Sequence, residues 1–97
     1  MVKFNKKKNS LVCSFTGRLD TQNCMQWQDE LIAKVKELKF PVCFDLQGVN
    51  YIASSFLRVC LKVAKEVKSE NLSLINLCPS IKKVFKIAGF DKQLNIN

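Results

Sequence analysis

The sequence predicts a small α/β domain in which three to four helices pack on a mixed, mainly parallel sheet of about four to five strands. The chain has 97 residues, enough for one domain (1–97) with a single hydrophobic core. Short apolar or alternating segments are interleaved with segments whose apolar residues recur every three or four positions. The resulting order is β-β-α-β-α-β-α-β. Strands that are connected through helices pair in parallel, so we expect the inner strands to be parallel.

The first half of the chain predicts two strands and one long helix. Residues 2–5 form a short edge strand, and residues 11–16 alternate as a half-buried strand that Gly17 ends. A helix over 21–38 is indicated by a stripe of apolar residues at helical spacing, namely Cys24, Trp27, Leu31, Val35 and Leu38. We expect Trp27 to anchor the core.

The second half predicts three more strands and two more helices. Proline at position 41 ends the first helix, because the residue before a proline avoids the helical conformation. The elements that follow are a strand at 42–46 with Gly48 in the turn after it, a helix at about 55–68, a strand at 71–77, a helix that starts at Pro79, and a short strand at 94–96. Gly89 fits the left-handed position just past the last helix.

Charge and residue usage narrow the function classes. The formal net charge of +8 attracts polyanions such as nucleic acids. Arginine makes most of the specific contacts to bases, however, and the chain has only Arg18 and Arg58. We therefore expect no specific binding of nucleic acid. The chain has no histidine, the commonest general base and metal ligand. We therefore expect no enzyme, no metal and no cofactor. No apolar run approaches the ~18 residues that span a bilayer, so we expect a cytoplasmic protein.

The five cysteines are expected to behave as small buried hydrophobes rather than as reactive thiols. Their number is odd and no C-x-x-C pair occurs, which favours neither a disulfide framework nor a zinc site. They are Cys13, Cys24, Cys43, Cys60 and Cys78.

Residues 51–58, which join a buried strand to a helix, carry the most informative chemistry. Ser54 falls at the expected N-cap and Ser55 at the first helical position. Free backbone N–H groups and the positive end of the helix dipole meet there and would stabilise a phosphate on Ser54. From local physics alone, a serine that only caps the helix is the simpler interpretation.

The helix after Ser54 has an apolar arc of roughly 200°, wider than the ~100° that a surface helix needs. Leu57, Cys60, Leu61, Ala64 and Val67 fill one face, and Phe56, Val59 and Val63 widen it. Two interpretations remain open. Either a neighbouring helix covers the extra flank, or Phe56 and Val59 stay accessible beside Ser54 as part of a docking patch.

The residues of this segment resemble a known family. Residues 44–58, Phe-Asp-Leu-Gln-Gly-Val-Asn-Tyr-Ile-Ala-Ser-Ser-Phe-Leu-Arg, resemble the central motif of STAS domains, the anti-sigma factor antagonist family. Residues 17–20, Gly-Arg-Leu-Asp, are similar to the family's first strand-to-helix junction, and residues 79–91 are similar to its C-terminal helix and glycine stop. The resemblance therefore covers nearly the whole chain in order.

The resemblance implies a switch of protein partners. It implies that Ser54, the first serine of the pair, accepts a phosphate. The unphosphorylated chain would bind a serine-kinase anti-sigma factor and free the sigma factor. The kinase would then phosphorylate Ser54 from ATP, and a serine phosphatase would reset the system. We expect a monomer or a weak homodimer.

The resemblance also assigns the other residues of the site. Partner contacts are expected from Asp20, Thr21, Ala53, Ser55, Phe56, Arg58 and Val59. Asp45 is assigned from the residues themselves: it is the lone carboxylate near a strand end beside this loop, with Phe44 and Leu46 expected to point the opposite way into the core. We expect it to accept hydrogen bonds from loop N–H groups and orient Ser54, although an edge-exposed polar strand residue is the alternative. Two positions depart from the family pattern, since Ala53 stands where Asp is common and Phe56 where Gly is usual. The alternative functions are a STAS-like subunit of a lipid-transport or stress-sensing complex without phosphorylation, or a basic nucleic-acid-binding module.

Overall fold

Five strands form one mixed sheet in the order β1-β2-β3-β4-β5. The computed structural model describes residues 2–90 and 94–96. The strands are β1 (Val2–Lys6), β2 (Leu11–Leu19), β3 (Val42–Ile52), β4 (Leu72–Ile75) and β5 (Asn95–Ile96). β1 is antiparallel to β2, and every other neighbouring pair is parallel, which confirms the predicted mixed, mainly parallel sheet.

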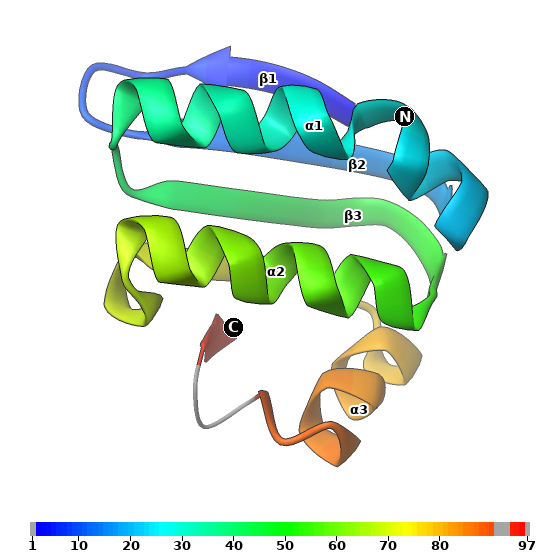
Figure 1. The fold of residues 1–97 in the computed structure, drawn as a ribbon. Coiled ribbons are helices and arrows are strands. Elements are labelled where there is room, and N and C mark those ends of the chain that lie inside the picture. Colours follow the sequence, from blue (N-terminus) through cyan, green and yellow to red (C-terminus); the bar gives the residue numbers. More distant parts are fainter. Residues whose placement is uncertain (1, 91–93, 97) are drawn as a thin grey trace.

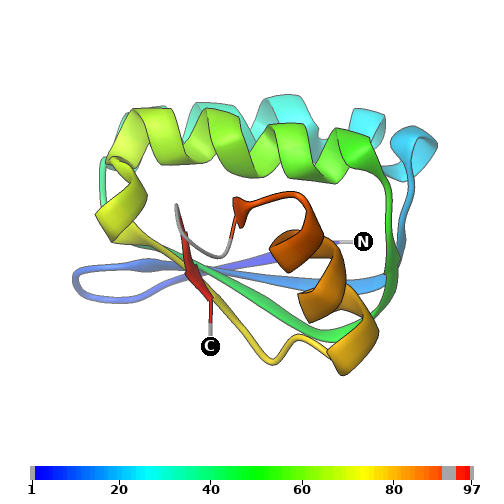
Figure 2. The same ribbon diagram turned by 90° about the horizontal axis from the view of Figure 1, so that it is seen from below.

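Three α-helices pack with this sheet. They are α1 (Thr21–Leu38), α2 (Ser54–Val67) and α3 (Pro79–Ile87), and a short 3-10 helix (Ser69–Asn71) follows α2. α1 and α2 lie side by side over one face of the sheet (Figures 1 and 2). α3 lies below α2 in Figure 1, beside the first turns of that helix. The helix order, and the bounds of α1, are those predicted from the sequence.

The core lies between the covered face of the sheet and the helices α1, α2 and α3. Its largest fully buried side chains include four phenylalanines, Phe15, Phe44, Phe56 and Phe85. Trp27 is also buried, as predicted, and its ring lies 5.1 Å from that of Phe15. Aromatic contacts of this kind add about 0.5–1.5 kcal/mol beyond the burial of area.

Two strands run further than predicted, because glycines lie within them rather than after them. Gly17 adopts a φ of +82° at a register shift, and β2 continues through it to Leu19. Gly48 lies inside β3, where an added Cβ would come within 2.9 Å of the Thr16 side chain. The predictions that Gly17 ends a strand and that Gly48 forms a turn are therefore wrong. Both glycines serve the pairing of β2 with β3.

The remaining ends differ from prediction by a few residues. α2 begins one residue earlier than expected, at Ser54, and β4 ends at Ile75 because Asn76 has a φ of +60°. Gly89 has a φ of +81°, which confirms the predicted left-handed position after α3. Phe90 folds back onto α3, with its ring 6.2 Å from that of Phe85.

All five cysteines are free. Cys13, Cys24 and Cys60 are buried, as predicted for small hydrophobes, and burial raises the pKa of each thiol. Cys43 and Cys78 are half-buried. The pKa of Cys78 is instead lowered, chiefly by its side-chain hydrogen bond with Ser80.

Candidate functional site at the start of helix α2

Two strand-to-helix junctions meet at one edge of the sheet. β2 and β3 are parallel neighbours, so the chain leaves both strands at the same edge to enter α1 and α2 (Figure 1). The N–H of Ala53 donates to the carbonyl oxygen of Leu19 at 2.9 Å. The Ser55 hydroxyl donates to Oγ1 of Thr21 at 3.1 Å. These bonds bring together four of the predicted site residues, Asp20, Thr21, Ala53 and Ser55.

Asp20 fixes the start of α1. Its Oδ1 accepts a hydrogen bond from the Asn23 N–H at 2.9 Å, so Asp20 is the N-cap of α1. Its Oδ2 lies 3.9 Å from Nε of Arg18, whose guanidinium stacks 4.2 Å from the centre of the Tyr51 ring. The two strand ends are thus joined by side chains as well as by backbone.

Ser54 is exposed and is the first residue of α2. The N-cap is Ala53, in extended conformation, so the prediction that Ser54 caps the helix is wrong. Ala53 has no side-chain oxygen, so the N-cap residue makes no side-chain hydrogen bond to the first turn of α2. The Ser54 hydroxyl makes no hydrogen bond to the part of the chain that the structure describes. Ser54 therefore presents a free hydroxyl beside the first N–H groups of α2, of which the Phe56 N–H donates to the Ala53 carbonyl oxygen at 3.0 Å.

Phe56 and Val59 belong to the core, which corrects their assignment to an accessible docking patch. Their exposed fractions are 0% and 1%. The Phe56 ring lies 5.3 Å from Phe15 and 6.5 Å from Phe85, edge to face in both pairs. Of the two interpretations left open, the covered flank is correct. The phenyl ring that replaces the usual glycine turns inward.

The accessible apolar side chains of α2 lie on its other flank. Leu57 and Leu61, one turn apart, are half-buried, and Arg58 between them is exposed. Ser55 and Glu66 mark the side that faces α1, since Ser55 bonds Thr21 and Glu66 lies 3.9 Å from Lys36.

Helical periodicity predicts both leucines on the core side of the helix. Leu57 packs against the core while remaining half-buried, and Leu61 is half-buried on the same flank. At ~100° per residue, Leu57 lies about 200° further round the helix than Ser55. Ser54, Leu57, Arg58 and Leu61 on α2, with Asp20, Thr21 and Ala53, are called the Ser54 surface below.

Asp45 does not orient Ser54, contrary to expectation. Its Oδ1 accepts hydrogen bonds from the Gln47 N–H at 3.1 Å and from Nδ2 of Asn76 at 3.0 Å. Because β3 continues to Ile52, Asp45 lies seven residues, roughly 23 Å, before the strand end that carries Ser54. Asp45 joins β3 to the segment after β4.

The described residues contain no cluster of three or more potential metal ligands. In residues 2–90 and 94–96, no helix is both long and apolar enough to cross a bilayer.

The fold and the paired strand-to-helix junctions define a STAS domain. The family model described as "Mlab, STAS domain" matches residues 2–96, so this chain belongs to the STAS family. Among curated proteins it is similar to "Putative anti-sigma factor antagonist BtrV" of Bordetella bronchiseptica. The two are 35% identical over 88 residues, which cover 89% of this chain and 76% of that protein.

Solved structures share the fold. The anti-sigma factor antagonist SpoIIAA in its unphosphorylated form superposes with a TM-score of 0.84 at 16% identity, over 100% of this chain and 88% of that one. A STAS domain protein from Planctomyces limnophilus superposes with a TM-score of 0.87 at 20% identity, and the match covers 98% of this chain and 87% of that one. The phosphorylated form of the Bacillus SpoIIAA superposes with a TM-score of 0.73 at 17% identity, and the match covers 100% of this chain and 91% of that one.

Asp91, the last residue of the segment that resembles the family's C-terminal helix, lies outside the described residues.

Proposed function

We propose that this protein is an anti-sigma factor antagonist that binds a serine-kinase anti-sigma factor through the Ser54 surface and is released when Ser54 is phosphorylated. The observation that carries the proposal is the free, exposed hydroxyl of Ser54 beside the anchored hydroxyl of Ser55. Membership of the STAS family and similarity to BtrV support the class of partner. SpoIIAA has been solved with and without phosphate, so one protein of this fold is known in both forms.

The hydroxyls of Ser54 and Ser55 differ in how accessible they are to a kinase. A kinase must bring an acceptor hydroxyl into line with the γ-phosphate of ATP, which requires an oxygen that solvent and partner can reach. Ser54 meets that requirement. Ser55 is half-buried, and its hydroxyl is held 3.1 Å from Thr21. We therefore assign the acceptor to Ser54.

The proposed transfer is a simple displacement at phosphorus. Oγ of Ser54 bonds to the γ-phosphorus of ATP as the bond to the β,γ-bridging oxygen breaks, ADP leaves, and the hydroxyl proton passes to a base of the kinase. A serine phosphatase reverses the state, because water cleaves the phosphoester and releases inorganic phosphate. The chain itself is the substrate and not the enzyme. Since ATP is the donor, we place the switch in the cytoplasm.

The phosphate would act on the interface more than on the fold. It adds about 1.5–2 negative charges, which the first turn of α2 stabilises through its backbone N–H groups and the helix dipole. Arg58 lies one turn further along α2 and adds a positive charge on the same face. In a complex, the same charge would be desolvated against the partner. A loss of ~3 kcal/mol weakens binding more than a hundredfold.

The two departures from the family pattern fit this proposal. Phe56 packs into the aromatic core, so its ring leaves the Ser54 surface open. Ala53 keeps the extended conformation of an N-cap through its 2.9 Å bond to Leu19. Neither change covers the hydroxyl of Ser54.

Titration of partner binding tests the proposal. The partner is isolated on immobilised Ser54→Ala protein, accepted only if it consumes ATP, and titrated with each variant by calorimetry. We expect Ser54→Asp to weaken binding by roughly a hundredfold and Ser54→Ala to keep it. Ser69→Asp, an exposed serine just past the far end of α2, is the matched control for charge. Equal binding by Ser54→Asp and by the original chain would refute the switch.

A further inference from the structure

The outer face of α3 exposes large apolar side chains to solvent. Its inner side chains, Ile81 and Phe85, are buried and hold the helix against the core. Ile87 has an exposed fraction of 76% and Val84 one of 38%, which makes them two of the four large exposed hydrophobic side chains in the described part of the chain. A single exposed apolar side chain is ordinary on a protein surface. Ile87 is by far the more exposed of the two, and the side chains around it on this nine-residue helix decide what this face can bind.

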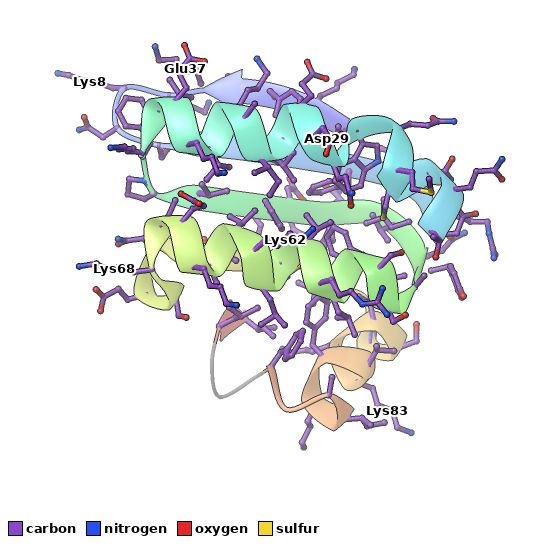
Figure 3. The ribbon with its side chains drawn as sticks, in the orientation of Figure 1. Lys8, Asp29, Glu37, Lys62, Lys68 and Lys83 are labelled. Atoms are coloured by element: carbon purple, nitrogen blue, oxygen red, sulfur yellow. The ribbon has the colours of Figure 1, made fainter. Side chains whose placement is uncertain are left out.

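Those neighbours are cationic. Lys82, Lys83 and Lys86 are exposed, and α3 carries no acidic residue at all. By contrast, α1 contains Asp29, Glu30 and Glu37, and α2 contains Glu66, which lies near Lys36. The lysines of α3 thus lack the carboxylates at helical spacing that normally offset surface lysines. Figure 3 shows Lys83 at the outer side of α3, pointing away from the rest of the molecule.

The charged and apolar side chains form one continuous stripe. Pro79, Lys83 and Ile87 follow one another at four-residue spacing, and Lys82 and Lys86 run beside them. Together they line a shallow hollow of about 630 Å³. We call these five residues the α3 stripe. It is about 12 Å long, which is two helical turns.

The chemistry of the α3 stripe selects its occupant. Interfacial membrane helices bury a continuous row of large apolar side chains in the lipid, whereas α3 exposes only Val84 and Ile87, because Ile81 and Phe85 are buried in the core. Specific nucleic-acid contacts rely on arginine, and α3 has none. A row of lysines flanking an exposed isoleucine instead complements a helix with carboxylates along one edge and an apolar side chain beside them.

We propose that the α3 stripe is a docking surface for an acidic, amphipathic helical segment of a partner protein. Lysine ammonium groups would pair with the carboxylates of the segment, and Ile87 would be covered by its apolar side chain. The α3 stripe shares no residue with the Ser54 surface, so the proposed contact does not require a phosphate on Ser54. The stripe would add a charge-sensitive contact that stays in place in both states of Ser54.

A synthetic peptide tests the proposal even before the partner is identified. The probe is a fluorescein-labelled amphipathic peptide of about four helical turns, with Glu and Leu on adjoining faces. Anisotropy measures its binding, and amide NMR shifts of the labelled protein locate it. We expect binding, with shifts at residues 79–87. The triple variant Lys82→Glu, Lys83→Glu, Lys86→Glu should weaken it by roughly tenfold or more.

Matched controls distinguish binding at the α3 stripe from a general effect of the protein's net positive charge. Lys6→Glu, Lys7→Glu, Lys8→Glu changes the net charge equally at the opposite end of the molecule, where Figure 3 labels Lys8, and should retain binding. Ile87→Ser should weaken binding while the lysines remain, and Ser54→Asp should leave it unchanged. Equal loss in the two triple variants, shifts elsewhere, or no binding would overturn the proposal. So would preferential binding to anionic phospholipid vesicles or to a DNA duplex in parallel titrations.

Discussion

The hydroxyl of Ser55 donates a 3.1 Å hydrogen bond to Oγ1 of Thr21, and this bond joins the first turn of α2 to the first turn of α1. The two residues are 34 positions apart in sequence. Because Ser55 turns toward α1, the preceding Ser54 faces solvent. One serine of the pair therefore holds the site together, and the other is left free for chemistry.

The coupling between these residues is measurable. We expect Ser55→Ala and Thr21→Val each to lower the free energy of unfolding by about 0.5–1.5 kcal/mol, the usual worth of a hydrogen bond. The double variant should cost less than the sum, because either change alone removes the same bond. Urea unfolding followed by the fluorescence of buried Trp27 reports all four proteins. Additive effects would show that the two hydroxyls do not interact.

Truncation of Phe56 should affect stability and not recognition. Phe56→Ala removes the ring that contacts Phe15 and Phe85, and we expect a loss of about 3–5 kcal/mol. Phe56→Leu keeps the domain folded at a smaller cost and allows partner affinity to be measured. Phe4→Ala, at a half-buried position on the edge strand, is the milder control. Weaker partner binding by folded Phe56→Leu, at unchanged melting temperature, would return Phe56 to the interface.

Leu61 should behave in the opposite way. It is half-buried on the Ser54 surface, so Leu61→Ser should reduce partner affinity by roughly tenfold while lowering stability by less than about 1.5 kcal/mol. Val63→Ser on the buried side of the same helix provides the contrast, since it should mainly destabilise the fold. Calorimetric titration and thermal melts distinguish the two. Unchanged affinity in Leu61→Ser would move the interface away from this flank.

Buried thiols give the stability a defined pH dependence. The pKa of Cys13 is raised from 9.0 to about 12, mainly by burial and secondarily by the Cys43 thiol, and burial also raises that of Cys60. In the unfolded chain such thiols ionise near their ordinary pKa, so folding favours the protonated form. Their contribution is fully present below about pH 9 and is lost as the pH rises toward about 12.

Between about pH 9 and about pH 10, each buried thiol should remove about 1 kcal/mol from the free energy of unfolding. Urea unfolding across this range measures the slope. The variant Cys13→Ala, Cys60→Ala should show a shallower decline than the original chain. Identical slopes would mean that these thiols ionise as readily in the folded chain as in the unfolded one.

The pattern of apolar and polar residues along the chain is sufficient to predict most of the fold. The apolar stripe from Cys24 to Leu38 predicts the bounds of α1, because the periodicity of a helix is encoded by neighbouring residues. Gly17 and Gly48 were misassigned because their roles depend on the opposite strand. Gly17 absorbs a register shift, and Gly48 makes room for Thr16.

The site was harder to predict than the fold. The family resemblance predicted that Asp20, Thr21, Ala53 and Ser55 belong to one site, and the parallel strands whose ends share an edge bring them together. Whether Phe56 or Leu57 lies on the accessible flank of α2 depends on where α1 packs. Helical periodicity carries no information about the position of α1. Asp45 was misplaced because the length of β3 decides how far it lies from Ser54.

Tandem mass spectrometry of the chain after reaction with its purified kinase partner and ATP decides whether the free hydroxyl is the switch. We predict one phosphate, on Ser54, with none added to Ser54→Ala and undiminished phosphorylation of Ser55→Ala. A phosphate on Ser55, or a Ser54→Ala protein phosphorylated as fully as the original chain, would contradict the proposed role of Ser54.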